Sequence, residues 1–293
     1  MNSIRLYWAT AGAGMRLIII NVVVFLLINI PLSIIFLLGN DQIESEVFKQ
    51  VALPGNLYEL LVKPWTLITH LFVHSGILHV LFNMLALYFS YQLFNRYLDD
   101  RRFINVYFVS GLSGAVIFIA SVNLLPVFTE NGGSGPLVGA SAAVLGVMIA
   151  ICAFRPNDQV SLFGVFTVKL IWIALTFVIL DLLQIRAGNV GGHLAHLGGA
   201  LFGFAWATAM RSGTDISSFF GIFQSLFKKG KKRQKKSPLK VVTGNRFSDS
   251  DWNMSRAERQ RRVDEILDKI NRSGYDSLTK EEKNLLFELS KDK

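Results

Sequence analysis

The sequence has a single cysteine and few charged residues. Cys152 is alone, which excludes an intrachain disulfide and leaves the redox compartment open. Charged residues make up 17% of the 293 positions, whereas 51% are hydrophobic, and the mean hydropathy is +0.40. This balance is unusual for a soluble domain and indicates a chain with membrane-length apolar segments.

Six hydrophobic segments approach the length of about 20 residues that a helix needs to cross a bilayer. They cover residues 17–38, 78–95, 103–125, 138–154, 166–184 and 193–210. The first is too long for the apolar core of a signal peptide, and no small-residue cleavage site follows Leu38. We therefore predict an all-α membrane protein whose core is a bundle of six transmembrane helices.

The distribution of positive charge predicts how these helices are oriented. The chain carries a net charge of +9. Arginines lie before the first segment, between the second and third, and after the fourth, and lysines fill the tail: Arg5, Arg16, Arg96, Arg101, Arg102, Arg155 and residues 228–236. The positive-inside rule then places both termini in the cytoplasm, so that segments two, four and six run inward.

Polar side chains lie near the outer ends of these three inward-running segments. His79, Ser141 and His196 each follow the start of a segment by a few residues, which is about 5 Å along a helix. Imidazoles and hydroxyls at such positions are costly in a membrane and usually functional. The sequence therefore predicts one polar layer near the outer face.

This layer has the groups that acyl transfer requires. The Ser141 hydroxyl needs an adjacent base to become a nucleophile, and a neutral His196 can take its proton. His79 and Asn83 share one helix face and can donate hydrogen bonds to an oxyanion, as can the backbone N–H of Ser141 at a helix start. None of the three helices has an Asp or Glu at this depth, so we predict a Ser–His dyad.

Small residues predict how the helices approach one another. Gly199 and Gly203 form a small-xxx-small ridge beyond His196, and Gly139 and Gly146 flank the serine. Such residues let helix backbones come close in membranes. We expect Gly139, Gly199 and Gly203 to pack the helices so that Ser141 and His196 meet.

Other polar residues have simpler interpretations. Taken alone, Ser141 could merely bond the carbonyl of the preceding turn. His193 competes with His196 as the base, but the glycine register favours His196 and leaves His193 at the outer interface. Asp181 and Lys169 lie toward segment ends, where snorkelling or interface exposure explains them.

His70 and His74 are spaced i, i+4 in the loop before the second segment. This spacing could serve a metal, but no carboxylate or third ligand accompanies them. Hydrogen bonds that order the loop are the preferred interpretation. We predict neither a metal nor a cofactor for this chain.

Three motifs in register carry a family resemblance. They are H-x-x-x-N at residues 79–83, G-x-S at 139–141 and A-H-x-x-G-x-x-x-G at 195–203. Together they resemble the rhomboid family of intramembrane serine proteases, in its bacterial six-span form with a C-terminal cytoplasmic extension. The resemblance covers roughly residues 15–210.

The resemblance implies a function and a role for each motif residue. Ser141 would be the nucleophile of a serine endopeptidase, His196 its base, and His79 and Asn83 would stabilise the oxyanion. Residues 53–76 would form a half-submerged loop. Substrates would be other membrane proteins, cut in or near a transmembrane segment that unwinds easily, and the protein would reside in a bacterial cytoplasmic membrane.

Three positions depart from the family pattern. Trp65 is followed by Thr66 where the family often has Arg, and Ala142 follows the serine where Gly is common. Leu145 replaces an aromatic residue that often packs on the base. We expect the Ala142 methyl to lie beside the oxyanion site, so these departures should bear on efficiency and substrate choice more than on the reaction.

The tail predicts a small soluble region. We divide the chain into a membrane domain (1–212), a basic cytoplasmic linker (213–253) and a helical hairpin (254–293). Seven Lys or Arg in residues 228–236 favour an anionic lipid surface over nucleic acid. Helical spacing and caps define the hairpin: Val263, Ile266, Leu267, Ile270, Gly274, Leu285, Leu286, Leu289, and the pairs Ser255–Glu258 and Thr279–Glu282.

Two rival functions remain. A weak or inactive relative that binds membrane-protein clients is favoured by Thr66 and Ala142 and opposed by the intact Ser141 and His196. A transporter would show an inverted repeat and polar groups at the midplane, and the sequence has neither feature. The expected partners are membrane-protein substrates and the bilayer, with no nucleic acid, and the sequence does not indicate an oligomeric state.

Overall fold

A computed structural model describes most of the chain. The described residues are 2–40, 42–130, 133–162, 164–220, 261, 264–279 and 282–283. The contacts divide the chain into two compact units, Met1–Lys229 and Gly230–Lys293. Each unit is described by itself below.

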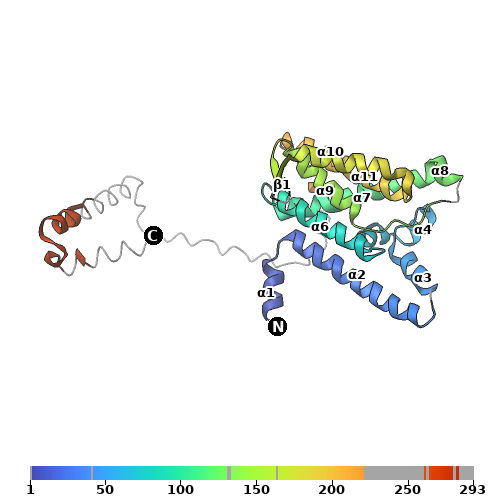
Figure 1. Ribbon diagram of the computed structural model, residues 1–293, viewed down its shortest axis with the longest axis horizontal. Coiled ribbons are helices and arrows are strands. Elements are labelled where there is room, and N and C mark those ends of the chain that lie inside the picture. Colours follow the sequence, from blue (N-terminus) through green and yellow to red (C-terminus); the bar gives the residue numbers. More distant parts are fainter. Residues whose placement is uncertain are drawn as a thin grey trace, which may run out of the picture. The chain divides into compact units, whose positions relative to one another are not determined.

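The first unit is built on six long helices, one for each predicted hydrophobic segment (Figure 1). They are α2 (Ala13–Leu37), α6 (Ile77–Phe94), α7 (Asp100–Leu124), α9 (Ser141–Phe154), α10 (Leu170–Gln184) and α11 (Val190–Arg211). Shorter helical elements connect them: α1 (Asn2–Thr10), α3 (Gln42–Val51), α4 (Leu57–Val62), α5 (Thr66–Thr69), η1 (His70–Phe72), α8 (Pro126–Thr129) and η2 (Ile185–Ala187).

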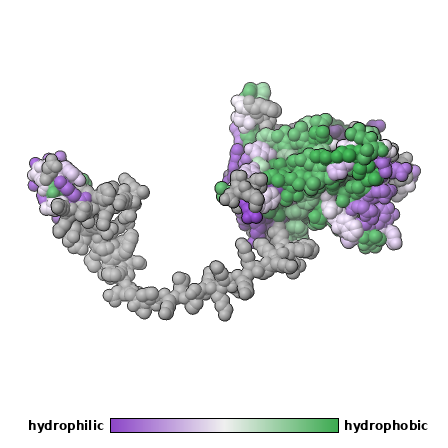
Figure 2. All heavy atoms as spheres, turned by 90° about the horizontal axis from the view of Figure 1, so that it is seen from below, coloured by the Kyte–Doolittle hydropathy of each residue, from purple (hydrophilic) through white to green (hydrophobic). Residues whose placement is uncertain are grey.

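The composition and exposure of these helices are those of a membrane protein. By length and hydropathy, three of the described helices can cross a bilayer, namely α2, α6 and α7, and α9 and α10 are shorter apolar helices. Large apolar side chains such as Trp172 and Leu183 lie exposed on α10. Figure 2 shows a broad band of hydrophobic residues across this unit. The fold is that of an all-α membrane protein.

Helix α9 lies at the centre of the bundle. All its residues from Ala142 to Ala153 are buried, because the helix is apolar on every side. It packs against α6, α7, α10 and α11, and α2 packs on α6 and α7. The first residue of α9 is therefore surrounded by several other helices.

One predicted segment begins differently in the structure. The segment predicted to start at residue 166 opens with strand β2 (Phe166–Lys169), which pairs antiparallel with β1 (Gln159–Leu162), and helix α10 starts only at Leu170. The β-branched Thr167 and Val168 favour this extended hairpin. Lys169 ends the strand and is exposed, in agreement with its predicted place at the end of a segment.

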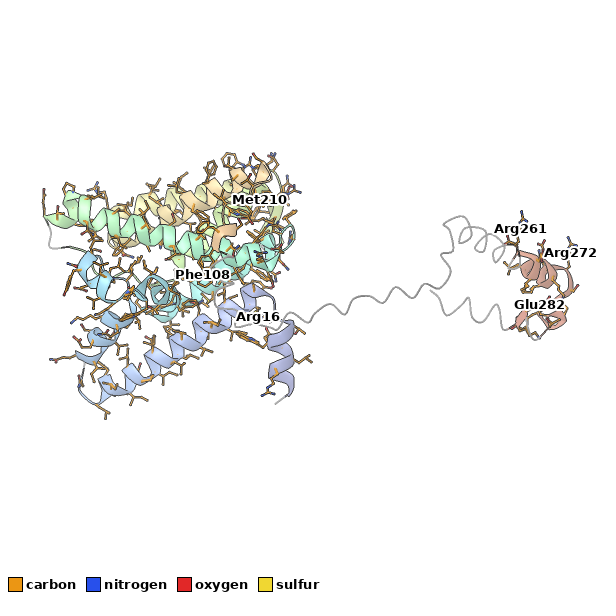
Figure 3. The ribbon with its side chains drawn as sticks, turned by 180° about the vertical axis from the view of Figure 1, so that it is seen from behind. Arg16, Phe108, Met210, Arg261, Arg272 and Glu282 are labelled. Carbon is orange, nitrogen blue, oxygen red and sulfur yellow. The ribbon has the colours of Figure 1, made fainter. Side chains whose placement is uncertain are left out.

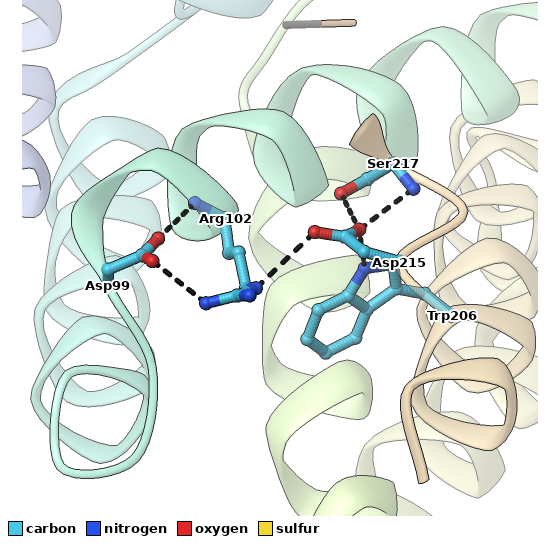
Figure 4. A network of polar contacts seen from close by, with 5 residues as sticks. All are labelled: Asp99, Arg102, Trp206, Asp215 and Ser217. Atoms are coloured by element: carbon cyan, nitrogen blue, oxygen red, sulfur yellow. Dashed lines mark hydrogen bonds and ion pairs between the residues drawn. The ribbon is translucent and has the colours of Figure 1, made fainter. Parts of the chain in front are cut away.

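A polar network joins the start of α7 to the chain that follows α11 (Figure 4). Asp99 caps α7 by accepting from the Arg102 backbone N–H at 2.9 Å, and the Arg102 guanidinium lies 3.4 Å from Asp215. Asp215 also accepts from Trp206 Nε1 at 2.9 Å and from Ser217 Oγ at 2.6 Å. These contacts anchor the segment after α11 to the membrane helices.

Aromatic stacking also holds the segment after α11 against α7. The ring of Phe108, which projects from α7 in Figure 3, stacks on Phe220 with ring centroids 5.4 Å apart. At the same end of the unit, the backbone N–H of Ala13 at the start of α2 donates to Asp100 Oδ2 of α7 at 3.0 Å. Arg16 in the first turn of α2 donates to the carbonyl oxygen of Trp8 at 3.1 Å, which ties α1 to α2.

The second unit contains helical residues 264–273, which end at Gly274 with a φ of +77°, followed by η3 (Tyr275–Ser277). Thr279 and Glu282 form reciprocal capping bonds of 2.7 and 3.3 Å, and Lys269 lies 3.0 Å from Glu282. Ile266 is buried and Leu267 is half-exposed. The other hairpin residues lie outside the described part: Ser255, Glu258, Val263, Leu285, Leu286 and Leu289, as do residues 228–236.

Candidate active site

A cavity of about 660 Å³ opens among the helices that carry the sequence motifs. Its wall is formed by α6, α9, α10 and α11 and by residues 136–138, and most of the lining is apolar. Ser141, His196, His79 and Asn83 all line it. The structure therefore brings together the four residues that the sequence selected.

The serine sits at the first position of α9 because of the turn before it. Gly139 has a φ of +117°, a conformation that favours glycine, and its N–H donates to the His70 carbonyl at 2.9 Å. Ala140 caps the helix and accepts the first intrahelical bond, from Val144, at 2.9 Å. The backbone N–H of Ser141 thus lies in the first turn, where such groups have no intrahelical acceptor.

The hydroxyl of Ser141 contacts the predicted base. Ser141 Oγ lies 2.6 Å from His196 Nε2. The contact depends on close packing of α9 against α11, because a Cβ placed on Gly199 or on Gly203 would come within 2.1 Å of the carbonyl oxygens of Ala142 and Gly146, respectively. Only glycine fits at these two positions without displacing backbone.

Asp181 corrects two interpretations made from the sequence. It is 8% exposed, and its Oδ1 lies 2.8 Å from His196 Nδ1, so the expectation that it lies at the interface was wrong. The prediction of a dyad without a carboxylate was based on the three motif helices alone. The carboxylate that contacts His196 comes from a fourth helix, α10. The buried residues Leu170, Ala174 and Asp181 share one face of α10 at i, i+4 and i+11, a spacing that could have revealed it.

His193 also lies elsewhere than predicted. Its side chain is 13% exposed and faces the cavity, and its Nδ1 lies 2.8 Å from the same Asp181 Oδ1. It packs edge-on against His196 with ring centroids 5.7 Å apart. The expectation of an outer-interface residue was wrong because His193 lies one turn before His196 and turns toward the same carboxylate.

The opposite wall of the cavity carries the predicted oxyanion donors. Asn83 Nδ2 donates to the His79 carbonyl at 2.9 Å, and His79 Nδ1 lies 3.2 Å from Ser75 Oγ. A Cβ on Gly139 would lie 2.7 Å from His79 Nε2 and 3.6 Å from Ser141 Oγ. Gly139 therefore precedes α9 instead of packing within a helix, and it leaves room for the His79 ring beside the serine.

The loop before α6 supports this wall from behind. His70 Nδ1 donates to the Thr66 carbonyl at 2.7 Å, and His74 packs edge-on against His79 with centroids 5.0 Å apart. Burial lowers the pKa of both His70 and His74 to about 4, so both are neutral at pH 7. Neutral imidazoles here suit a loop-ordering role.

The positions that depart from the family pattern have distinct surroundings. Thr66 is buried and donates to the Lys63 carbonyl at 2.6 Å, whereas Trp65 is half-exposed. The methyl of Ala142 was expected beside the oxyanion site, but it faces α7, where a Cβ on Gly114 would lie 2.7 Å from it, and Ala142 does not line the cavity. That expectation was therefore wrong. Leu145 lines the cavity.

Comparisons with known proteins agree with these motifs. A family model described as Rhomboid domain matches residues 62–213, and one described as a family of unknown function (DUF6576) matches residues 248–292. RHOMBOID-like protein 12, mitochondrial, of Arabidopsis thaliana is 28% identical over 183 residues, which are 59% of this chain and 51% of that protein.

Two animal relatives give the same picture. The human presenilin-associated rhomboid-like protein, mitochondrial, is 28% identical over 71% of this chain and 52% of its own length. That of Rattus norvegicus is 31% identical over 51% of this chain and 38% of its own length. The chain thus spans about half or less of these relatives. Their mitochondrial names conflict with the predicted bacterial cytoplasmic membrane, so only integral membrane residence is retained.

Proposed function

This chain belongs to the rhomboid family, and from that premise we propose that it is a serine endopeptidase that cleaves membrane proteins in or near their transmembrane segments. The observation that carries the proposal is the 2.6 Å contact between Ser141 Oγ and His196 Nε2 at the wall of a cavity. A serine paired with an imidazole is the arrangement that activates a hydroxyl for acyl transfer.

His196 moves the proton in both halves of the reaction. Its Nε2 takes the proton of Ser141 as Oγ attacks the substrate carbonyl, and then gives it to the leaving amine. Water, activated by the same imidazole, hydrolyses the acyl-enzyme. Asp181 acts as a positioning residue, because a carboxylate at Nδ1 holds the proton there and leaves the Nε2 lone pair facing the serine.

Three donors surround the place where the oxyanion forms. The Ser141 N–H belongs to the first turn of α9, and His79 and Asn83 face it from α6. The Asn83 amide has two hydrogens, of which one goes to the His79 carbonyl, so the other serves the oxyanion. Donors fixed before the reaction stabilise the developing charge at little reorganisation cost.

The cavity lining indicates the substrate class. Phe82 of α6 and Phe177 and Leu180 of α10 line the cavity and also have exposed surface on the apolar belt of the unit. A peptide entering between α6 and α10 must expose its backbone to Ser141, which a hydrogen-bonded helix does not do. Transmembrane segments weakened by glycine or proline are therefore the favoured substrates.

Cleavage of a co-expressed single-span protein tests the proposal. We expect wild type to cut a segment containing a helix-breaking residue, and Ser141→Ala and His196→Ala to leave it intact. A fluorophosphonate probe in membranes should label wild type and not Ser141→Ala, independently of the substrate chosen. Ser110→Ala is the matched control, since Ser110 is another buried serine of the bundle.

Several results would contradict the proposal. Cleavage that survives Ser141→Ala, or a wild type that neither cuts nor reacts with the probe, would favour an inactive client-binding relative. Activity in His196→Ala together with its loss in His193→Ala would mean that His193 is the base.

A further inference from the structure

Asp181, His193 and His196 direct three metal-binding atoms at one point of the cavity wall. The two Nδ1 atoms each lie 2.8 Å from Asp181 Oδ1, and the three donor atoms lie within 4.8 Å of one another. Two imidazoles and a carboxylate form a donor set typical of a zinc site that keeps its fourth position open. The open position here would face the cavity.

A second observation is that one oxygen of the Asp181 carboxylate lacks a hydrogen-bond partner among the described residues. Asp181 Oδ2 is buried and has no hydrogen-bond partner among the described residues, although it belongs to an ionisable group. A buried carboxylate oxygen without a partner is destabilising. A bound cation would satisfy it.

Binding a zinc ion requires the three donor atoms to move to equal spacings. Tetrahedral zinc with bonds of about 2.0–2.1 Å holds its donors roughly 3.3 Å apart. The Nδ1–Oδ1 pairs at 2.8 Å must therefore open by about half an ångström, and the two Nδ1 atoms, which lie within 4.8 Å of each other, must come to the same spacing. Both imidazoles are partly exposed, so rotation of their side chains can supply these shifts. The preference for zinc over Mg²⁺ or Ca²⁺ follows from the two imidazoles, since those harder cations select oxygen ligands.

We propose that Asp181, His193 and His196 bind Zn²⁺ and that the bound ion reversibly inhibits the enzyme. The inhibition rests on the function proposed above. Zinc takes the lone pair of His196 Nδ1, so the neutral imidazole carries its proton on Nε2, and no proton is lost overall. Nε2 then donates to Ser141 Oγ and cannot accept its proton, which removes the general base.

Direct binding is the first test and does not depend on activity. The full chain, purified without a polyhistidine tag, is titrated with Zn²⁺ against a chromophoric chelator and with Co²⁺ by visible absorption. We expect one site with a tetrahedral Co²⁺ spectrum. His193→Ala and His193→Gln should weaken Zn²⁺ binding about tenfold or more. The matched control, Gln184→Ala, alters another cavity residue on α10 and should bind as wild type does.

Absence of a saturable site in wild type overturns the proposal, as does unchanged affinity in both His193 variants, whose folding is checked by gel-filtration elution.

The second test measures cleavage with and without Zn²⁺, relative to each variant's own metal-free rate. We expect inhibition that a chelator reverses, no effect of Mg²⁺, and an inhibition curve shifted about tenfold in the His193 variants. A wild type active without metal but unaffected by bound Zn²⁺ refutes the inhibition alone, whereas a wild type inactive without metal refutes the proposed function.

Discussion

At the residue scale, the orientation of His196 is set from both sides. Ser141 Oγ contacts one ring nitrogen at 2.6 Å and Asp181 the other at 2.8 Å. His193 shares the same carboxylate oxygen, so Asp181 is hydrogen-bonded to two imidazoles at once. The carboxylate therefore holds in place the part of the site that moves the proton.

Asp181→Asn should lower the cleavage rate by roughly 10²- to 10⁴-fold, the range associated with loss of a correctly placed proton-transfer partner. An amide can donate to Nδ1, which favours the tautomer with its proton on Nε2 and leaves Ser141 without an acceptor. The measurement is the initial rate on a single-span substrate in detergent. Fluorophosphonate labelling should fall in parallel while the melting temperature changes little.

Thr176→Val, at an exposed position of the same helix that does not line the cavity, is the matched control for Asp181→Asn and should keep the wild-type rate. A rate within threefold of wild type in Asp181→Asn would show that Ser141 and His196 act without the carboxylate.

The two buried histidines of the loop before α6 predict a pH-dependent stability. The folded chain keeps His70 and His74 neutral down to about pH 4, whereas in the unfolded chain they take up protons near pH 6.5. The unfolded state therefore binds more protons in this window, and stability falls as the pH is lowered through it. Between pH 7.5 and 5 we expect a loss of about 2 kcal/mol for each histidine.

Thermal unfolding in detergent at a series of pH values measures this loss. His74→Gln removes one titrating group and should reduce the pH dependence by about half, whatever its effect on stability at pH 7.5. A pH dependence in His74→Gln equal to that of wild type would contradict this assignment.

How far the site could be predicted depends on the residue. The sequence predicted His79, Ser141 and His196 because each lies near the start of a helix that runs in the same predicted direction. It predicted Asn83 because this residue shares a helix face with His79. Asp181 was missed because it lies at the end of its helix, where a charged residue ordinarily reaches the interface. One face of α10 is buried because the helix packs against the bundle, and the sequence of this segment alone does not predict that packing.

At the element scale, the contact between α9 and α11 decides whether Ser141 and His196 meet. Gly199 faces the Ala142 carbonyl and Gly203 the Gly146 carbonyl, so two backbones touch along a full turn. Neither carbonyl can move without moving α9 itself. The register of the serine and the base is fixed by these two glycines.

Gly199→Ala should destabilise the protein by about 3 kcal/mol or more, the upper range for overpacking, because its methyl would meet a backbone oxygen at 2.1 Å. The free energy of unfolding in mixed micelles measures this change, and cleavage should fall with it. The same substitution at Gly135 is the control, since a Cβ there meets nothing within 4 Å. Equal stability of the two variants would be inconsistent with the close contact.

The lengths of the elements were harder to predict than their existence. Helix α9 has 14 residues, so it is about 21 Å long, less than the roughly 30 Å of a bilayer core. It needs no lipid-facing length because the other helices surround it. Its apolar composition predicted a helix, but only the packing explains its shortness, and only strand pairing explains the late start of α10.

At the scale of the whole molecule, two units correspond to two family matches. The rhomboid match ends at residue 213 and the second match begins at residue 248. The predicted boundaries at residues 212 and 253 lie near these limits and stay predictions, as does the helical hairpin. The network at Asp215 shows where the first unit holds the chain that leaves it.

The arginines of the loops predict that residues 95–102 face the cytoplasm and that residues 126–137 face the other side. Single cysteines test this directly, because Cys152 is buried and the native chain should react little with a maleimide. Thr129 and Asn95 are both exposed and lie on opposite predicted sides. In intact bacteria expressing the chain, an impermeant maleimide should label Thr129→Cys at once and Asn95→Cys only after permeabilisation. The reverse pattern would place Ser141 and His196 near the cytoplasmic face. Equal labelling of the two cysteines before permeabilisation would contradict the six-span topology. The common depth of Ser141, His79 and His196 was predicted from that topology.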